Sequence, residues 1–380
     1  MRLLSACLSF SLRNLAQHKI RSLAATAGIT FALFLIFLQW GLLDGAKRQI
    51  TAFYDYFDYD IVVLDDAYQF MFTAEPFDRI RLMQAQALES VEKTFAINFA
   101  LGIWEDNASH LRSTLMLFGV DPDSGLILEP SISEGLKSLH GQRNILIDAL
   151  SHSDFGSLTP GTRALINGQE VQISSHFRLG LFFYAEGAAL VDNTAFSRLA
   201  QRSARDTSFG MIRLKEGADP WVEREKLARL LPGDVIALTK EELLGKENSY
   251  FVNVKPLGII FTAGVSISFV TATVILFQVI STSIATRLRE YATLRAMGFG
   301  FGFVFGSAAI QAFTLSSCAF AGAAVISAAL FGYIFQLTNL PLALTRELII
   351  LVLGMTQVMC LAISFATLRD LSRMHPADLY

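Results

Sequence analysis

Four long apolar segments divide the chain, and each is long enough to cross a membrane as a helix. They cover residues 22–43, 257–286, 303–336 and 348–368, and none contains Asp, Glu, Lys, Arg or His. A helix needs about 20 mostly apolar residues to cross the hydrocarbon core of a bilayer. The pattern therefore predicts four transmembrane helices, one before and three after a long polar segment.

The polar segment, residues 44–256, alternates short β-type runs with helical stretches, which predicts a large mixed α+β domain. Residues 60–65 read Asp-Ile-Val-Val-Leu-Asp, a pattern typical of a buried strand. Helical apolar spacing continues past the first span to residue 57, and residues 240–248 are helix-prone, so we expect a helical stalk at each end of the domain. Further strands are expected at residues 114–120, 144–147, 164–166, 170–173, 188–191 and 211–214, and further helices at residues 76–91 and 220–231.

The distribution of charge indicates how the chain lies in the membrane. Residues 44–256 contain 21 Lys and Arg residues against 30 Asp and Glu residues, whereas residues 1–21, 287–302 and 369–380 together hold nine basic and three acidic residues. Short cytoplasmic loops are enriched in Lys and Arg. We therefore expect both termini and residues 287–302 in the cytoplasm. The acidic domain and the short loop at residues 337–347 are then on the outer side.

The N-terminal segment, residues 1–21, predicts an amphipathic helix on the cytoplasmic side. Leu4, Leu8, Leu12 and Leu15 form an apolar edge at helical spacing. A secretory signal peptide is the alternative interpretation. The apolar run that follows is too long for such a signal, and Leu-Leu-Asp-Gly-Ala is a poor cleavage site. The pattern favours an uncleaved first span.

The sequence contains no recognisable catalytic or metal-binding pattern. The three cysteines are Cys7, Cys318 and Cys360, so no disulfide is expected in the polar domain. The six histidines fit no ligand spacing, and no phosphate-binding loop, nucleophile elbow or zinc-protease helix occurs. We expect a protein that is not an enzyme, with no catalytic residue, no metal and no cofactor of its own. Nothing indicates a nucleic-acid partner.

Residues 287–302 form a short basic segment between the second and third spans, reading Arg-Leu-Arg-Glu-Tyr-Ala-Thr-Leu-Arg-Ala-Met-Gly-Phe-Gly-Phe-Gly. Its first part is helix-prone, and Gly298 suits a left-handed stop. A helix joined to a span at each end cannot move without moving both spans. Any cytoplasmic loop is basic, but the ordered Arg-Glu, Arg and Gly spacing favours a docking helix for a separate ATPase subunit.

Residues 287–298 resemble the Arg-x-Arg-Glu-x-x-x-x-Arg-x-x-Gly signature of FtsX-like ABC transporter permeases of the MacB type, and the whole pattern is most similar to the DevC subgroup. Residues 14–22 resemble the basic entry to that family's first span, and residues 373–379 resemble its tail. The arrangement of one span, a domain and three spans fits as well. The sequence departs from the family pattern at Tyr291, where an aliphatic residue is usual, and at Asp378, which replaces Glu.

The resemblance implies a permease subunit in a bacterial inner membrane, surrounded by membrane lipid and paired with a second copy of itself. A separate ABC ATPase would bind ATP and Mg²⁺. ATP hydrolysis by this ATPase would move the periplasmic domain, a coupling called mechanotransmission. That movement would drive efflux of a lipid-like or other envelope cargo through a periplasmic membrane-fusion adaptor and a TolC-like outer-membrane channel. By this resemblance the ATPase-coupling residues are Arg287, Arg289, Glu290, Tyr291, Leu294, Arg295 and Gly298.

Two alternatives share this arrangement of spans and stay open from the sequence. One is an FtsX-like regulator that transmits ATP hydrolysis to a periplasmic enzyme, although the outer domain of such regulators is usually smaller. The other is a lipoprotein-releasing permease. A membrane enzyme is disfavoured because no constellation of polar residues supports one.

Overall fold

The computed structural model consists of two compact units. The helical unit comprises Met1–Gly45, Ile260–Leu337 and Leu342–Tyr380, and the α+β unit comprises Ala46–Ile259 and Thr338–Pro341. The structure describes residues 19–125, 127–128, 130–139, 143–180, 185–287, 290, 292–293, 297–298, 300–338, 340 and 342–372.

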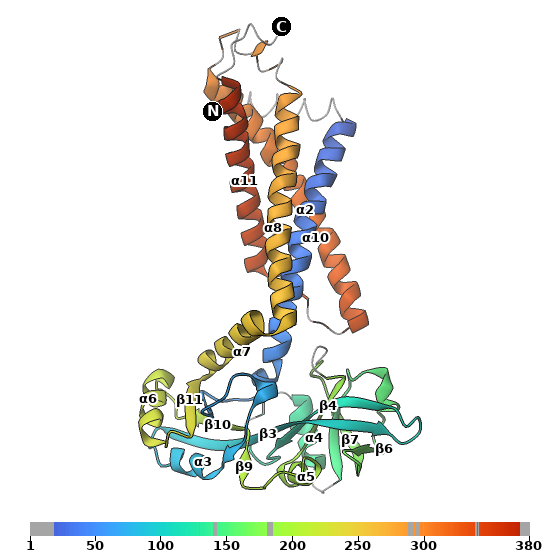
Figure 1. Cartoon of the computed structure of the whole chain (residues 1–380), viewed down its shortest axis with the longest axis vertical. Coiled ribbons are helices and arrows are strands. Elements are labelled where there is room, and N and C mark those ends of the chain that lie inside the picture. The colour runs from blue at the N-terminus through green and yellow to red at the C-terminus, as the bar shows by residue number, and fades with distance from the viewer. Residues whose placement is uncertain are drawn as a thin grey trace. The chain divides into compact units, whose positions relative to one another are not determined.

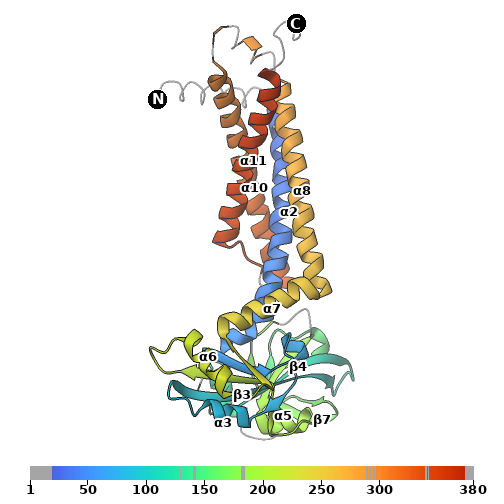
Figure 2. The same ribbon diagram turned by 60° about the vertical axis from the view of Figure 1, so that its left-hand side comes forward.

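Four long helices run side by side in Figure 1 and in Figure 2, which confirms the predicted spans. Each contains a stretch long and apolar enough to cross a membrane. Residues 1–18 of the expected N-terminal helix and residues 373–380 of the expected tail lie outside the described residues. The four helices are α2 (Lys19–Thr51), α8 (Pro256–Ala285), α10 (Phe301–Thr338) and α11 (Arg346–Ser372).

The helical unit has its own buried cluster, to which all four helices contribute. Leu33 and Phe37 of α2 are almost completely buried in it. At Gly41, a Cβ atom would lie 2.4 Å from the ring of Phe331 in α10. At Gly264 of α8, a Cβ atom would lie 2.5 Å from Oε1 of Gln39 in α2. Small residues at such positions let helix backbones approach closely, as in other membrane helix pairs.

The α+β unit contains one large mixed sheet and a separate small sheet, in which β2 pairs with β9. Its strands are β1 (Ile61–Asp65), β2 (Phe77–Asp78), β3 (Val91–Asp106), β4 (Arg112–Val120), β5 (Asn144–Asp148), β6 (Arg163–Ile166), β7 (Gln169–Phe177), β8 (Gly187–Asp192), β9 (Asp206–Thr207), β10 (Phe209–Leu214) and β11 (Val235–Thr239). Its helices are η1 (Ala52–Tyr56), η2 (Met71–Thr73), α3 (Ile80–Ala85), α4 (Pro130–Leu136), η3 (Lys137–Leu139), η4 (Ser153–Phe155), α5 (Asn193–Leu199), α6 (Pro220–Leu230) and α7 (Lys240–Val254).

Strand β3 belongs to two parts of this sheet. The sheet order is β11-β1-β10-β3-β4-β8-β5-β7-β6, and β6 also pairs with β3, where Trp104 faces Ile166. A closed ring is therefore formed by β3, β4, β8, β5, β7 and β6, in that spatial order. Strands β11, β1 and β10 extend the first half of β3 as an open sheet. Side chains from every strand of the ring, with Trp104 among them, meet in one buried cluster.

Two further clusters cover the faces of the open part of the sheet. One contains Leu227 of α6 and Ala85 of α3. The other contains the aromatic residues of η1 and Leu243 of α7. The polar segment is therefore a mixed α+β domain, as predicted.

The expected strands are all present, and the helix expected at residues 220–231 corresponds to α6. The single helix expected at residues 76–91 is wrong, because β2 occupies residues 77–78 and only α3 is α-helical there. Strand β3 was not expected. Its burial alternates from Leu101 to Trp104 but is continuous from Phe95 to Phe99, so its sequence lacks a uniform period of two.

Candidate functional site

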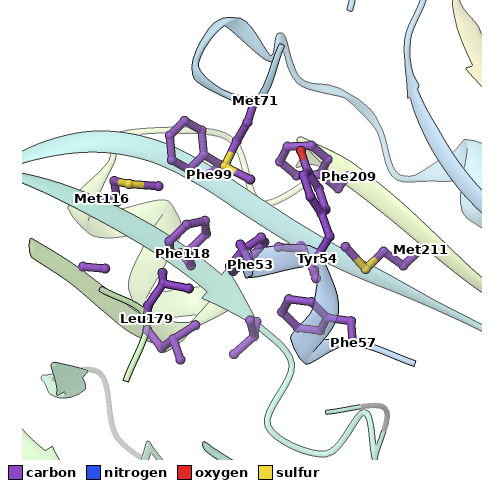
Figure 3. Close-up of a cluster of buried hydrophobic side chains, with 14 of the residues drawn as sticks. Phe53, Tyr54, Phe57, Met71, Phe99, Met116, Phe118, Leu179, Phe209 and Met211 are labelled. Carbon is purple, nitrogen blue, oxygen red and sulfur yellow. The ribbon is translucent and has the colours of Figure 1, made fainter. Parts of the chain in front are cut away.

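The segment that follows α2 lies in the core of the α+β unit. Phe53 and Tyr54 of η1 and Phe57, which directly follows it, are buried (Figure 3). Phe53 stacks on Phe118 of β4 with ring centroids 3.9 Å apart, and Tyr54 meets Phe209 of β10 edge-on at 6.0 Å. Buried aromatic rings contribute large apolar areas. The chain leaving α2 is thus fixed to two central strands rather than connected by a loop.

Polar contacts fasten the last turns of α2 and η1 to the ring of strands. The Gln49 amide donates to the carbonyl of Gly180, whose own N–H donates to Asp148 Oδ2 at 2.9 Å. The Tyr56 hydroxyl donates to the carbonyl of Arg178. Burial raises the pKa of the Asp148 carboxyl, and three backbone N–H donors oppose that rise. This second attachment is independent of the aromatic one.

Helix α7 leads from the sheet toward α8 and has strong signals at both ends. Thr239 and Glu242 form a reciprocal capping box at its start. Pro256 begins α8 two residues after α7 ends, as expected for a first helical position. At Gly258, a Cβ atom would lie 2.0 Å from the carbonyl oxygen of Phe251. The α7–α8 junction is therefore too tight for any residue but glycine at this position.

A carboxyl group on α7 is buried inside the α+β unit. Oε1 of Glu247 accepts hydrogen bonds from the hydroxyls of Tyr54 and Tyr68 and from the N–H of Met71. The sequence predicts a charged helical stalk at residues 240–248 and does not single out Glu247. The spacing offered one signal, since Leu243, Glu247 and Phe251 recur every four residues and form the buried face of α7.

The expected coupling segment begins where α8 ends. Arg287 is 6% exposed, and its backbone N–H donates to the carbonyl of Ile284 at 3.0 Å. Glu290 is exposed and in helical conformation. The backbone N–H of Met297 donates to Thr293 at 3.0 Å, a helical bond, and Gly298 has φ of +90°. The left-handed stop expected at this glycine is present.

The other predicted coupling residues cannot be placed. Arg289, Tyr291, Leu294 and Arg295 lie outside the described residues. Helix α10 begins at Phe301, so the last two residues of the expected segment belong to it. The coupling role of all seven residues stays a prediction.

The end of α8 nearest this segment is joined to both following spans by polar side chains. Gln311 of α10 donates from Nε2 to Ser283 Oγ at 3.4 Å. The hydroxyls of Ser281 and Thr367, on α8 and α11, lie 3.1 Å apart. Hydrogen bonds between helices hold neighbouring spans together in lipid. A displacement of the coupling segment would therefore reach three spans.

One comparison with known proteins found a family that matches the C-terminal third of the chain. Residues 245–376 match the family model described as FtsX-like permease C-terminal. A search of curated proteins found no match.

Solved structures similar to this chain include three domains of low sequence identity. The extracellular domain of the noncanonic ABC-type transporter YknZ from Gram-positive bacteria is 11% identical with a TM-score of 0.33, and the alignment covers 47% of this chain and 98% of that one. The periplasmic region of MacB from Actinobacillus actinomycetemcomitans is 8% identical with a TM-score of 0.34, covering 51% and 94%. A domain of a putative permease protein from Porphyromonas gingivalis is 12% identical with a TM-score of 0.31, covering 48% and 92%.

The matched segment contains α8, α10 and α11 together with Arg287, Glu290 and Gly298. It also begins within α7, two residues before Glu247. Residues 245–376 of this chain are therefore an FtsX-like permease C-terminal domain.

Proposed function

We propose that this chain is the membrane subunit of a MacB-type ABC exporter in a bacterial inner membrane. Two copies pair, and a separate ATPase subunit, which binds ATP and Mg²⁺, docks on residues 287–302 at the cytoplasmic side. Both termini are cytoplasmic, and the α+β unit is periplasmic. ATP-driven movement of the spans displaces the α+β units, which drive a lipid-like or other envelope cargo through a periplasmic adaptor and a TolC-like outer-membrane channel.

One observation carries this proposal beyond the family match. Helix α2 is uninterrupted over 33 residues. At 1.5 Å per residue it is about 50 Å long, whereas the hydrocarbon core is about 30 Å thick. The helix therefore extends beyond the bilayer, and the segment after it is packed against Phe118 and Phe209. A helix held in this way transmits a displacement over its whole length.

The second connection, through α7 and α8, is also helical and also ends in the core of the α+β unit. Helix α7 contributes Leu243, Glu247 and Phe251 to the buried part of the α+β unit. It is followed by α8 with only Lys255 between them. The coupling segment follows α8 directly. Movement at Glu290 would thus be passed along α8 to a helix embedded in the α+β unit.

The ATPase assignment is tested by copurification. The full chain is co-expressed with candidate ABC ATPases encoded beside its gene, and the ATPase retained with the purified chain is measured in detergent. We expect Glu290→Lys to abolish retention, because the reversed charge repels a basic partner site. Glu347→Lys is the matched control: Glu347 is an exposed acid in the first turn of α11.

Retention by wild type and by the Glu347→Lys control, but not by Glu290→Lys, supports the proposal. Equal retention by all three proteins refutes the role of the coupling segment. If no candidate ATPase is retained by the wild type, the ABC assignment itself is wrong. If an ATPase is retained, co-expression with candidate periplasmic partners separates export from regulation. Binding of a membrane-fusion adaptor supports the exporter, and binding of a cell-wall hydrolase activator supports the FtsX-like regulator.

A further inference from the structure

Two tyrosine hydroxyls from separate parts of the α+β unit meet one oxygen of a buried carboxyl group. Tyr54 Oη lies 3.1 Å from Glu247 Oε1 and 3.0 Å from Tyr68 Oη, and Tyr68 donates to the same Oε1. The N–H of Met71 completes the set at 3.0 Å. The three side chains are at most 1% exposed. Figure 3 shows Tyr54 and Met71 within the buried hydrophobic cluster of this unit.

The number of protons in this triangle of oxygens depends on the state of Glu247. Each tyrosine hydroxyl supplies one proton, so an ionised Glu247 leaves two protons for three oxygen–oxygen contacts. Protonation of the carboxyl adds a third donor. Oε2 of Glu247 has no hydrogen-bond partner among the described residues. A buried carboxylate with one unpartnered oxygen is costly, whereas a neutral carboxyl is less so.

Burial of Glu247 also favours the protonated carboxyl. Burial raises the pKa of Glu247 to about 7, against the lowering effects of the Tyr68, Tyr54 and Met71 hydrogen bonds and of the Lys246 charge. Burial and Glu247 in turn raise the pKa of Tyr54 and Tyr68, so both stay protonated.

The remaining titratable groups nearby lie on the η1 side and on α7. The pKa of Tyr59 is raised by burial, by Asp55 and by Glu247. Lys240 Nζ lies 5.0 Å from the centre of the Tyr59 ring and 3.6 Å from Asp55. Lys246 Nζ lies 5.9 Å from the centre of the Tyr68 ring. Glu247 is the acid among these groups that titrates near neutral pH.

The cluster joins the two segments through which the α+β unit continues into membrane helices. Tyr54 lies three residues after the end of α2, and Glu247 lies in the middle of α7. We propose that Glu247 is a proton-sensitive clamp that holds α7 against the segment following α2, closed when the carboxyl is protonated and weakened when it ionises. Its effect on transmission rests on the proposed function, whereas the clamp itself does not.

The direction of the pH effect follows from the difference in the pKa of Glu247 between the folded and the open state. A carboxyl whose pKa is higher in the folded state than in the open state stabilises the folded state below the open-state pKa, and that stabilisation is lost as the pH rises through the folded-state value. With a folded-state pKa of about 7 and an ordinary value of 4.5 in the open state, the equilibrium constant for opening α7 rises about tenfold between pH 6 and pH 8.

Hydrogen–deuterium exchange of the full chain in lipid nanodiscs, without any ATPase, tests the clamp. Exchange of the amides of α7 is measured at pH 6 and pH 8 and corrected for intrinsic rates. We expect the tenfold increase in opening in the wild type and in Glu241→Gln, an exposed acid on the same helix. Glu247→Gln keeps the acceptor oxygen without the titration and should open equally at both pH values.

Tyr68→Phe removes a donor that stabilises the ionised form and should move the midpoint of the wild-type transition to higher pH. A tenfold pH effect that persists in Glu247→Gln, or that is absent from the wild type, overturns the proposal. Because no ATPase is present, neither result depends on the copurification experiment. If the wild type retains no candidate ATPase but shows the pH transition, the exporter is refuted and the clamp stands.

Discussion

The junction between α7 and α8 offers the sharpest test of how the α+β unit is connected to the permease domain. Replacing Gly258 by Ala places a Cβ 2.0 Å from the Phe251 carbonyl oxygen, 2.6 Å from its carbonyl carbon and 3.0 Å from Val252 Cα. All three are backbone atoms, so no rotamer change relieves the overlap. Close carbon–oxygen contacts are about 3.3 Å, so the two helices must separate by roughly 1.3 Å.

Forcing extra atoms into a packed site costs about 1–3 kcal/mol. A backbone overlap belongs at the upper end, and the better helix propensity of Ala returns about 1 kcal/mol, so we expect a net cost of about 2 kcal/mol. Gly245 is the matched control, because it is exposed in α7 and no atom apart from the adjacent helix backbone lies within 4 Å of its Cβ position. Gly245→Ala should stabilise α7 by about 1 kcal/mol.

Hydrogen exchange of the full chain in nanodiscs measures both changes. Since 1.4 kcal/mol is a factor of ten, peptides across the α7–α8 junction should exchange about 30-fold faster in Gly258→Ala. The amides of α7 should exchange about fivefold more slowly in Gly245→Ala. If the two variants exchange alike, the junction is not held by the close contact of Gly258 with Phe251, and the reasoning fails.

Two further predictions concern the attachments of α7 and η1. Thr239→Ala removes the capping box with Glu242 and should lower the stability of the α+β unit by about 1–2 kcal/mol, seen as a lower thermal midpoint. Thr239→Ser keeps a capping hydroxyl and should restore the wild-type midpoint. Equal midpoints for the wild type and both variants would contradict the capping role. Phe53→Ala empties the site stacked on Phe118 and should cost about 3–5 kcal/mol, measured by denaturant unfolding followed by tryptophan fluorescence. Phe53→Leu, which refills most of the volume, should lose less than half of that, and a loss equal to that of Ala would mean that ring stacking rather than filled volume decides the stability.

Much of the fold could be predicted because its signals are local. A membrane helix is recognised from a run of apolar residues, because its backbone groups form hydrogen bonds within the helix and its side chains face lipid. The strands around residues 144–147 and 188–191 were recognisable from short apolar runs. The left-handed conformation of Gly298 followed from its position after helix-forming residues.

Strand β3 and the helix wrongly expected at residues 76–91 show where local signals end. Strand β3 runs through both the open sheet and the closed ring, and its partners change along its length from β10 to β4 and β6. Its buried face therefore changes with those partners and has no single period. Residues 77–78 pair with β9, and the partner residues lie more than 120 positions away in the chain.

The sequence by itself determined the four spans, the α+β domain between the first two and the family of the C-terminal part, because each rests on composition or on a short ordered motif. Only the tertiary structure decided which acid of the stalk is buried. Glu241, Glu242 and Glu247 are alike in sequence, yet Glu247 alone of the three is completely buried. Its partners Tyr54 and Tyr68 are 193 and 179 residues away. The free energy of a charge depends on the groups that surround it, and folding alone brings those groups together.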